Sequence, residues 1–229
     1  MWKPHYSFVA LVALVVAAAS SPLARADDET PSYRGPASAA EARFVRAIQA
    51  DLGKRFARAS DAEHGGYVRY TEEDETGAIS YAARQWASDP RHPSQLWYDV
   101  HGRLLGADFA RPVAGGRPRL WGIDPGRWII FPDHIHYVAR DERGRIRYGR
   151  GTTIEAFAAA GGDPHHPAAG TLVRMGKART PADVLAVFEF PRIYDLIVWI
   201  APNPAGAFAN ANPLVHPSRR VADPKTDVH

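Results

Sequence analysis

Two histidines separated by one residue provide the clearest chemical signal in the sequence. They lie in the segment Asp133–His136, which reads Asp-His-Ile-His. Successive side chains of a strand point to opposite faces, so a strand here would project His134 and His136 from one face. Ile135 and Tyr137 would then belong to the opposite, apolar face. The spacing therefore predicts two imidazoles placed side by side on a strand.

Two neighbouring imidazoles are a starting point for a metal site. Neutral imidazole binds zinc, copper, iron or nickel, and the chain contains no cysteine that could supply a thiolate. A third ligand would have to come from another element, and the candidates are Asp99, His92, Glu189 and Asp195. Asp99 is preferred because it lies on the strand predicted from Leu96 to Val100. The sequence thus predicts one divalent-metal site made of His134, His136 and Asp99, and it leaves open whether that site is catalytic.

Two of these carboxylates also lie in unusually apolar surroundings. Glu189 is flanked by Phe188 and Phe190, and Asp195 lies in the apolar run Ile193–Ala201. A buried carboxylate must be paired, bind a metal or take up a proton, because burial disfavours its charge. We therefore expect perturbed pKa values at Glu189 and Asp195, with structural pairing to an arginine as the alternative to a functional role.

Four aromatic residues support a different function. Tryptophan and tyrosine rings bind flat ligands, although they also fill small cores. The residues concerned are Trp97, Trp121, Trp128 and Tyr137. If these rings lined one pocket, the protein would be a metal-free binding or interaction module for a small molecule or for another protein. The sequence leaves this alternative open beside the metal site.

The N-terminal residues match a secretory signal peptide. Lys3 precedes an apolar run from Phe8 to Ser20, and Ala24-Arg25-Ala26 forms a small-x-small cleavage site. This layout predicts cleavage after Ala26, a flexible lead-in over residues 27–37 and a periplasmic or secreted location. No later run approaches the length of a membrane span, so we expect no stable membrane insertion after cleavage.

Composition and charge narrow the classes of partner. Of the 229 residues, 45% are hydrophobic and 23% are charged, which is typical of a globular protein and excludes a disordered or collagen-like chain. Cleavage would remove Lys3 and Arg25 from the 28 Lys and Arg, against 25 Asp and Glu, and leave a net charge of about +1. Arginines cluster between residues 140 and 150, but Asp141 and Glu142 lie among them. We therefore expect no nucleic-acid partner, which would require a basic face.

A helix and a series of hairpins are expected to carry these residues. Ser38 and Glu41 form a capping-box pattern, and apolar residues at helical spacing continue to Phe56. Hairpins are predicted where β-rich runs flank turn residues, at 66–71 with 78–86, 96–100 with 103–109 and 134–140 with 145–149.

The remaining elements complete the expected fold. Short helices are predicted over residues 152–160 and from Thr180. The apolar runs 187–190 and 193–201 suit strands that are buried on both faces, with a buried helix as the alternative that periodicity leaves open. The pattern predicts a single α+β domain over residues 38–216, composed mostly of antiparallel sheet, with an irregular tail at 217–229.

Overall fold

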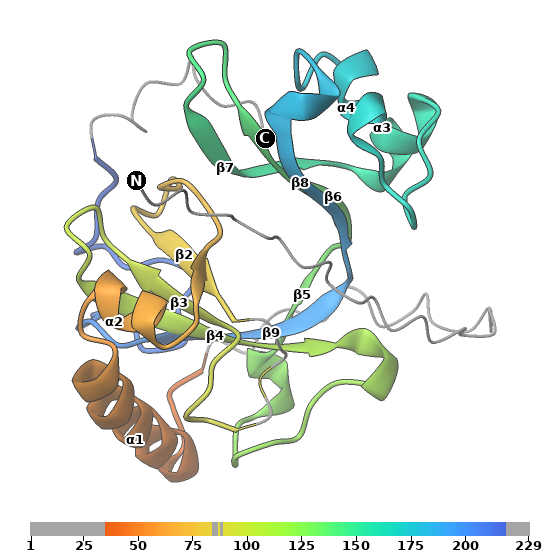
Figure 1. Cartoon of the computed structure of the whole chain (residues 1–229). Helices are drawn as coiled ribbons and strands as arrows, with labels where there is room; N and C mark the ends of the chain where they lie inside the picture. The colour runs from red at the N-terminus through yellow and green to blue at the C-terminus, as the bar shows by residue number, and fades with distance from the viewer. Residues whose placement is uncertain (1–34, 84–86, 88, 219–229) are drawn as a thin grey trace. The chain divides into compact units, whose positions relative to one another are not determined.

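The chain folds into a mixed α+β structure with mostly antiparallel sheets, which confirms the predicted class. The computed structural model describes residues 35–83, 87 and 89–218 (Figure 1). The predicted signal peptide, most of the lead-in and most of the tail lie outside the described residues. Within the described residues, no helix is both long and apolar enough to cross a bilayer.

Helix α1, Ala39–Arg55, begins at the capping box that the sequence specifies. The Ser38 hydroxyl accepts a hydrogen bond from the backbone N–H of Glu41, and the Glu41 carboxylate accepts one from the backbone N–H of Ser38. These bonds satisfy helix amides that would otherwise lack a partner. Helix α2 is a single short turn, Ala59–His64, which the sequence pattern did not predict.

The larger sheet has six strands in the order β1-β2-β3-β4-β9-β5, and all neighbouring pairs are antiparallel. Their bounds are β1 Val68–Arg69, β2 Ile79–Ala82, β3 Gln95–Tyr98, β4 Leu104–Pro112, β5 Ile129–Phe131 and β9 Ile193–Trp199. The hairpins β1–β2 and β3–β4 form at the predicted positions, the second through Gly102 at a φ of 69°. Strand β9 lies between β4 and β5, which places it inside the sheet.

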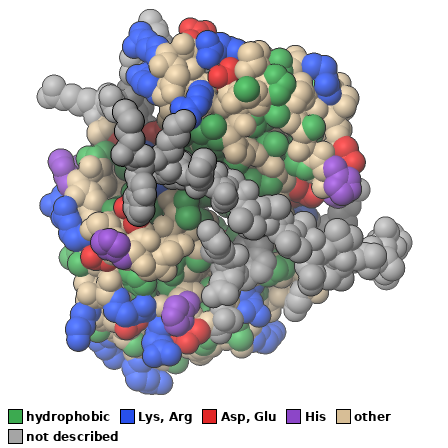
Figure 2. Space-filling view, viewed as in Figure 1, with side chains coloured by type: hydrophobic (Ala, Val, Ile, Leu, Met, Phe, Trp, Pro, Cys, Tyr) green, Lys and Arg blue, Asp and Glu red, His purple; other side chains and the backbone are tan. Residues whose placement is uncertain are grey.

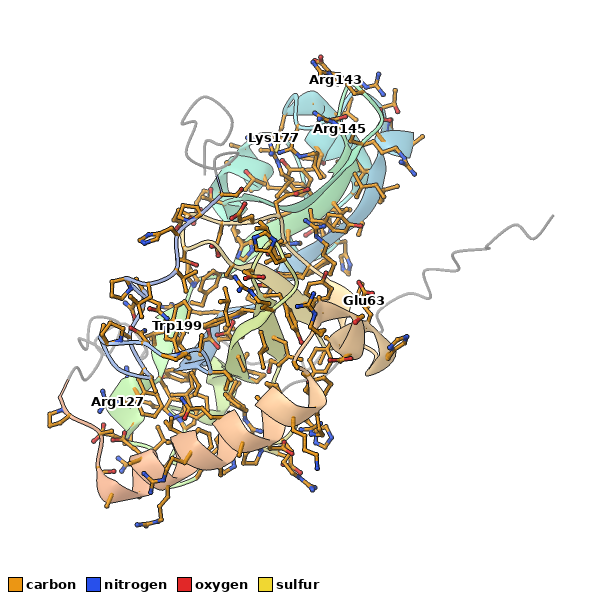
Figure 3. All side chains as sticks on the ribbon, turned by 90° about the vertical axis from the view of Figure 1, so that its left-hand side faces the viewer. Glu63, Arg127, Arg143, Arg145, Lys177 and Trp199 are labelled. Carbon is orange, nitrogen blue, oxygen red and sulfur yellow. The ribbon has the colours of Figure 1, made fainter. Side chains whose placement is uncertain are left out.

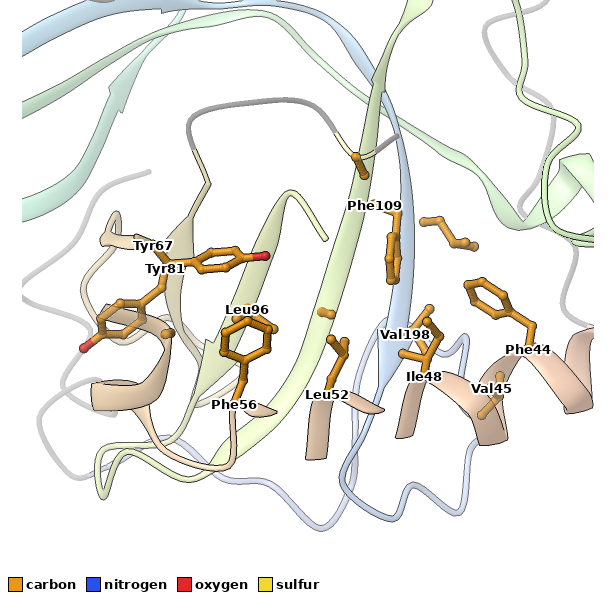
Figure 4. Packing of buried hydrophobic residues seen from close by; sticks show 14 of the residues in the cluster. Phe44, Val45, Ile48, Leu52, Phe56, Tyr67, Tyr81, Leu96, Phe109 and Val198 are labelled. Carbon is orange, nitrogen blue, oxygen red and sulfur yellow. The ribbon is translucent and has the colours of Figure 1, made fainter. Parts of the chain in front are cut away.

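Helix α1 packs on one face of this sheet (Figure 4). Ile48 and Leu52 are 2% and 0% exposed, respectively. They belong to a core that includes Leu96 of β3, Phe109 of β4 and Val198 of β9. The apolar stripe of the predicted helix is therefore the stripe that the sheet buries.

The smaller sheet has three antiparallel strands in the order β7-β6-β8. Their bounds are β6 His134–Arg140, β7 Ile146–Thr152 and β8 Val184–Phe190. Two short helices, α3 (Ile154–Ala159) and α4 (Ala169–Arg174), cover one of its faces (Figure 1). Phe157 of α3 and Leu172 of α4 pack there against Ile135 and Tyr137 of β6.

The irregular connections contain three 3-10 turns, whose bounds are η1 Val113–Gly115, η2 Pro125–Arg127 and η3 Pro181–Asp183. The last of these replaces the helix predicted from Thr180. The Asp183 carboxylate accepts hydrogen bonds from the Thr180 backbone N–H and hydroxyl, so the capping interaction forms although the helix does not extend.

Charged side chains of both signs share the visible surface (Figure 2). In the β6–β7 turn, Arg145 Nε donates to the Asp141 carboxylate over 2.8 Å, and the turn projects Arg143 and Arg145 at one end of the fold (Figure 3). Arg147 of β7 lies 3.7 Å from Glu72. Arg145 and Arg147 of the arginine cluster therefore have acidic neighbours.

Candidate functional site

The two histidines lie on the same face of β6, and we call them the histidine pair. The centroids of the His134 and His136 rings are 5.9 Å apart. The Tyr70 ring stacks on His136 with centroids 4.2 Å apart and planes 7° apart. His134 stacks on Phe190 with centroids 4.9 Å apart. Only 3% of His136 is exposed, so β6 is covered on this face as well as on the face of Ile135.

Further aromatic rings complete the surroundings of the histidine pair. Phe188 of β8 lies 5.1 Å from His136, and Phe131 of β5 lies 5.8 Å from His134, measured between ring centroids. Residues of both sheets thus contribute to this cluster, because β5 belongs to the larger sheet and β8 to the smaller one. The imidazoles are enclosed mainly by apolar surface.

Apolar surroundings keep both imidazoles uncharged. Burial and the neighbouring His134 lower the pKa of His136 to about 3, although a hydrogen bond to the backbone of Tyr70 acts in the opposite direction. Burial also lowers the pKa of His134, against the influence of the backbone of Pro132. Both side chains are therefore neutral at pH 7, and each has one N–H group and one nitrogen lone pair.

The hydrogen bonds identify which nitrogen carries the lone pair. His134 Nδ1 lies 3.2 Å from the carbonyl oxygen of Pro132, to which it donates. His136 Nε2 is buried and has no hydrogen-bond partner among the described residues. His134 thus has its Nδ1–H fixed by a carbonyl and its Nε2 lone pair available, as is common for histidines that bind metals.

The structure does not bring Asp99 to the histidine pair. Asp99 lies in the β3–β4 turn, where its carboxylate accepts hydrogen bonds from the backbone N–H of His101 and from the Arg103 side chain. Its strand belongs to the larger sheet, whereas β6 belongs to the smaller one. Among the described residues, no three His, Asp or Glu side chains are grouped so as to hold one metal ion. The structure therefore does not assemble the predicted set of His134, His136 and Asp99.

Two other third-ligand candidates have different partners. His92 is exposed in a turn and lies 3.7 Å from Asp89. Glu189 pairs with Ile135 in the β6–β8 register, so it projects from the face opposite the histidine pair. There its carboxylate lies 2.9 Å from Nδ1 of the exposed His165.

The fourth candidate, Asp195, belongs to a second cluster, which we call the carboxyl pair. Its partner is Asp108 of β4, and the two residues are 7% and 6% exposed. Asp195 lies opposite Ala110 in the β4–β9 register, so Asp108 is its diagonal neighbour on the same face. The indole Nε1 of Trp97 donates to Asp108 Oδ2 over 2.9 Å.

Burial dominates the electrostatics of the carboxyl pair. It raises the pKa of Asp195 to about 7. Burial, followed by the negative charge of Asp195, also raises the pKa of Asp108 well above its usual range. Because burial disfavours the charge of both side chains, the pair retains a proton at pH values where an ordinary aspartate is ionised.

The four aromatic residues of the alternative function do not line one pocket. Trp121 and Trp128, with ring centroids 6.0 Å apart, belong to the core beneath α1. Trp97 packs with Trp199 on the other face of the larger sheet. Tyr137 is buried under α3 and α4. Strand alternation and the separation into two sheets disperse these rings into three clusters, in which they fill core positions.

Two residues at these sites were not singled out from the sequence. Asp108 interrupts the apolar run 104–110, which is the same signal that identified Asp195. Tyr70 follows β1 and has no distinctive neighbours in sequence, so only the tertiary structure shows that it covers His136.

Comparisons of the chain with models of known protein families, with curated proteins and with solved structures found no match. The function must therefore be argued from the histidine pair and the carboxyl pair themselves.

Proposed function

We propose that this chain is an exported protein that binds a divalent transition metal ion through Nε2 of His134 and Nε2 of His136. Zinc, copper, nickel and iron are the candidate ions, because neutral imidazole is a suitable ligand for each. Two protein ligands leave coordination positions for water or for an exogenous molecule, and such open positions are a feature of catalytic metal sites.

The observation that carries this proposal is the state of His136. Its Nε2 is buried without a partner among the described residues, which is costly for a polar atom unless a ligand satisfies it. Its neighbour His134 lies on the same strand face, and a backbone carbonyl holds the Nδ1 of His134. Two oriented, neutral imidazoles are ready to bind a metal without first losing protons at pH 7.

Thermal unfolding of the purified mature protein with each of the four metals tests the proposal. An ion that binds the folded state raises the melting temperature, and the shift grows with the metal concentration. We expect such a shift at pH 7.5, and we expect His134→Ala and His136→Ala each to abolish it.

His165→Ala provides the matched control, because His165 is an exposed histidine whose partner is Glu189 on the opposite face of β8. This variant should keep the full metal-dependent shift. A melting temperature that does not respond to any of the four metals would contradict the proposal, and so would a shift that survives both histidine substitutions.

A further inference from the structure

Among the described residues, no cationic side chain neutralises the carboxyl pair. No ion pair within the described residues joins Asp108 or Asp195 to a cationic side chain, and the remaining carboxylate that acts on Asp108 is Asp74, which repels it. The donors that reach the pair are the Trp97 indole and the backbone N–H of Leu196. Two ionised carboxylates in such surroundings would repel each other strongly.

A single shared proton resolves this conflict. Asp108 Oδ1 and Asp195 Oδ1 are both buried, and neither has a hydrogen-bond donor among the described residues. Both atoms are acceptors when the carboxylates are ionised, so they cannot bond each other in that state. A proton on Asp108 converts one acceptor into a donor, and the hydrogen bond between the side chains then forms.

The pair links parts of the fold that are distant in sequence. Asp108 and Asp195 lie on neighbouring strands of the larger sheet, and Trp97 extends the hydrogen bonds to β3. Trp97 in turn packs with Trp199 and with Val215 of the C-terminal segment. Besides apolar side chains, the groups that face the pair are the Asp74 carboxylate, the Trp97 indole and the backbone amide of Leu196.

We propose that Asp108 and Asp195 form a proton-operated latch, in which the protons bound by the pair hold this face of the larger sheet together and their loss weakens that face. Aspartyl pairs that share a proton are known to titrate as a unit rather than as separate groups. The latch makes the stability of the fold sensitive to the acidity of its surroundings. It does not depend on the histidine pair or on a bound metal.

The sign of the effect follows from the raised pKa. Asp195 titrates at about 7 in the folded chain, against 3.8 for an ordinary aspartate. The stabilising contribution is therefore complete below pH 3.8, declines as the pH rises toward 7, and is lost above it. Over this interval the unfolding equilibrium constant should increase by up to about tenfold per pH unit because of Asp195 alone.

Denaturant unfolding between pH 5 and pH 9 tests the latch in the mature chain without added metal. We expect the wild-type unfolding constant to rise from pH 5 to pH 7 relative to that of Asp195→Asn, whose amide cannot ionise. Asp141→Asn is the matched control, because the pKa of Asp141 is lowered and its contribution is constant above pH 5. Because burial also raises the pKa of Asp108, a smaller slope should remain in the variant. A slope as steep in Asp195→Asn as in the wild type would overturn the proposal.

Infrared spectroscopy of the wild-type protein provides a second readout, in case the amide variant fails to fold. The carbonyl band of a protonated, buried carboxylic acid should be present at pH 5 and weaker at pH 9, because Asp195 loses its proton between these values. Isotopic labelling of aspartate should shift this band. A spectrum without a protonated aspartyl band at pH 5 would contradict the latch whether or not the variant folds.

Discussion

The two faces of the six-stranded sheet stabilise their buried carboxyl groups in different ways. Beneath α1, the carboxylate of Glu41 is 1% exposed but has Arg127 Nε as a partner over 3.1 Å. On the opposite face, Asp108 and Asp195 are almost as buried, and they have each other instead of a cation. The first arrangement is a completed ion pair, and the second depends on a proton.

The difference arises within the same strands. Phe109 follows Asp108 in β4, and Leu196 follows Asp195 in β9. Side chains alternate along a strand, so neighbouring residues point to opposite faces. Phe109 and Leu196 enter the core beneath α1, whereas Asp108 and Asp195 point to the other face of the sheet. A sheet can therefore carry a stable apolar core on one side and titratable groups on the other, and we expect the two faces to respond differently to substitution.

The largest loss of folding free energy should come from breaking the ion pair between Glu41 and Arg127. Burial acts to raise the pKa of Glu41, but bonds from Arg127 and from the backbone of Ser38 and Asp124 more than offset this and lower it. Glu41→Gln would leave Arg127 buried with an uncompensated charge, which costs about 3–5 kcal/mol of folding free energy. Urea unfolding at pH 7 measures this loss. A loss smaller than that of a surface Glu→Gln change, such as Glu63→Gln, would show that the pair contributes little.

A slightly smaller effect is expected from the apolar part of the same face. Ile48 is 2% exposed between α1 and the sheet, so Ile48→Ala removes buried methyl groups and leaves a cavity. Such changes cost about 2–5 kcal/mol. The loss should be the same at pH 5 and pH 8, since no titratable group is involved. A loss of less than half a kilocalorie per mole would mean that α1 is peripheral to the fold.

The smallest loss of folding free energy is expected on the opposite face, and there the loss should depend on pH. Trp97→Phe removes the Nε1–H donor to Asp108, and the loss of one such buried hydrogen bond costs about 1–3 kcal/mol. Because the bond lowers the pKa of Asp108, the variant should retain the shared proton to a higher pH. Trp199→Phe, which removes a bond to the Ala209 carbonyl, is the control that should not move this titration. If the stability of both variants depended on pH in the same way, the bond from Trp97 would have no influence on the titration of the carboxyl pair.

The sequence predicted the parts of this structure that depend on local pattern. The capping box at Ser38, the alternation around His136 and the apolar surroundings of Asp195 each depend on nearby residues. The third-ligand choice of Asp99 was wrong because β3 ends at Tyr98, so Asp99 lies in the β3–β4 turn, where its carboxylate is bonded to His101 and Arg103. The stacking of Tyr70 on His136 and the pairing of Asp108 with Asp195 depend on register between distant segments, which no local pattern encodes.

The most direct test of the central claim is nitrogen NMR of the histidine imidazoles in the mature protein, with and without zinc. In the absence of metal, we expect His134 and His136 to carry the proton on Nδ1, and we expect His136 to stay neutral down to about pH 3. Zinc should shift the Nε2 signals of both rings and leave the His165 ring unchanged. Nε2 signals that do not respond to zinc, or a His136 ring that titrates near pH 6.5, would contradict the account.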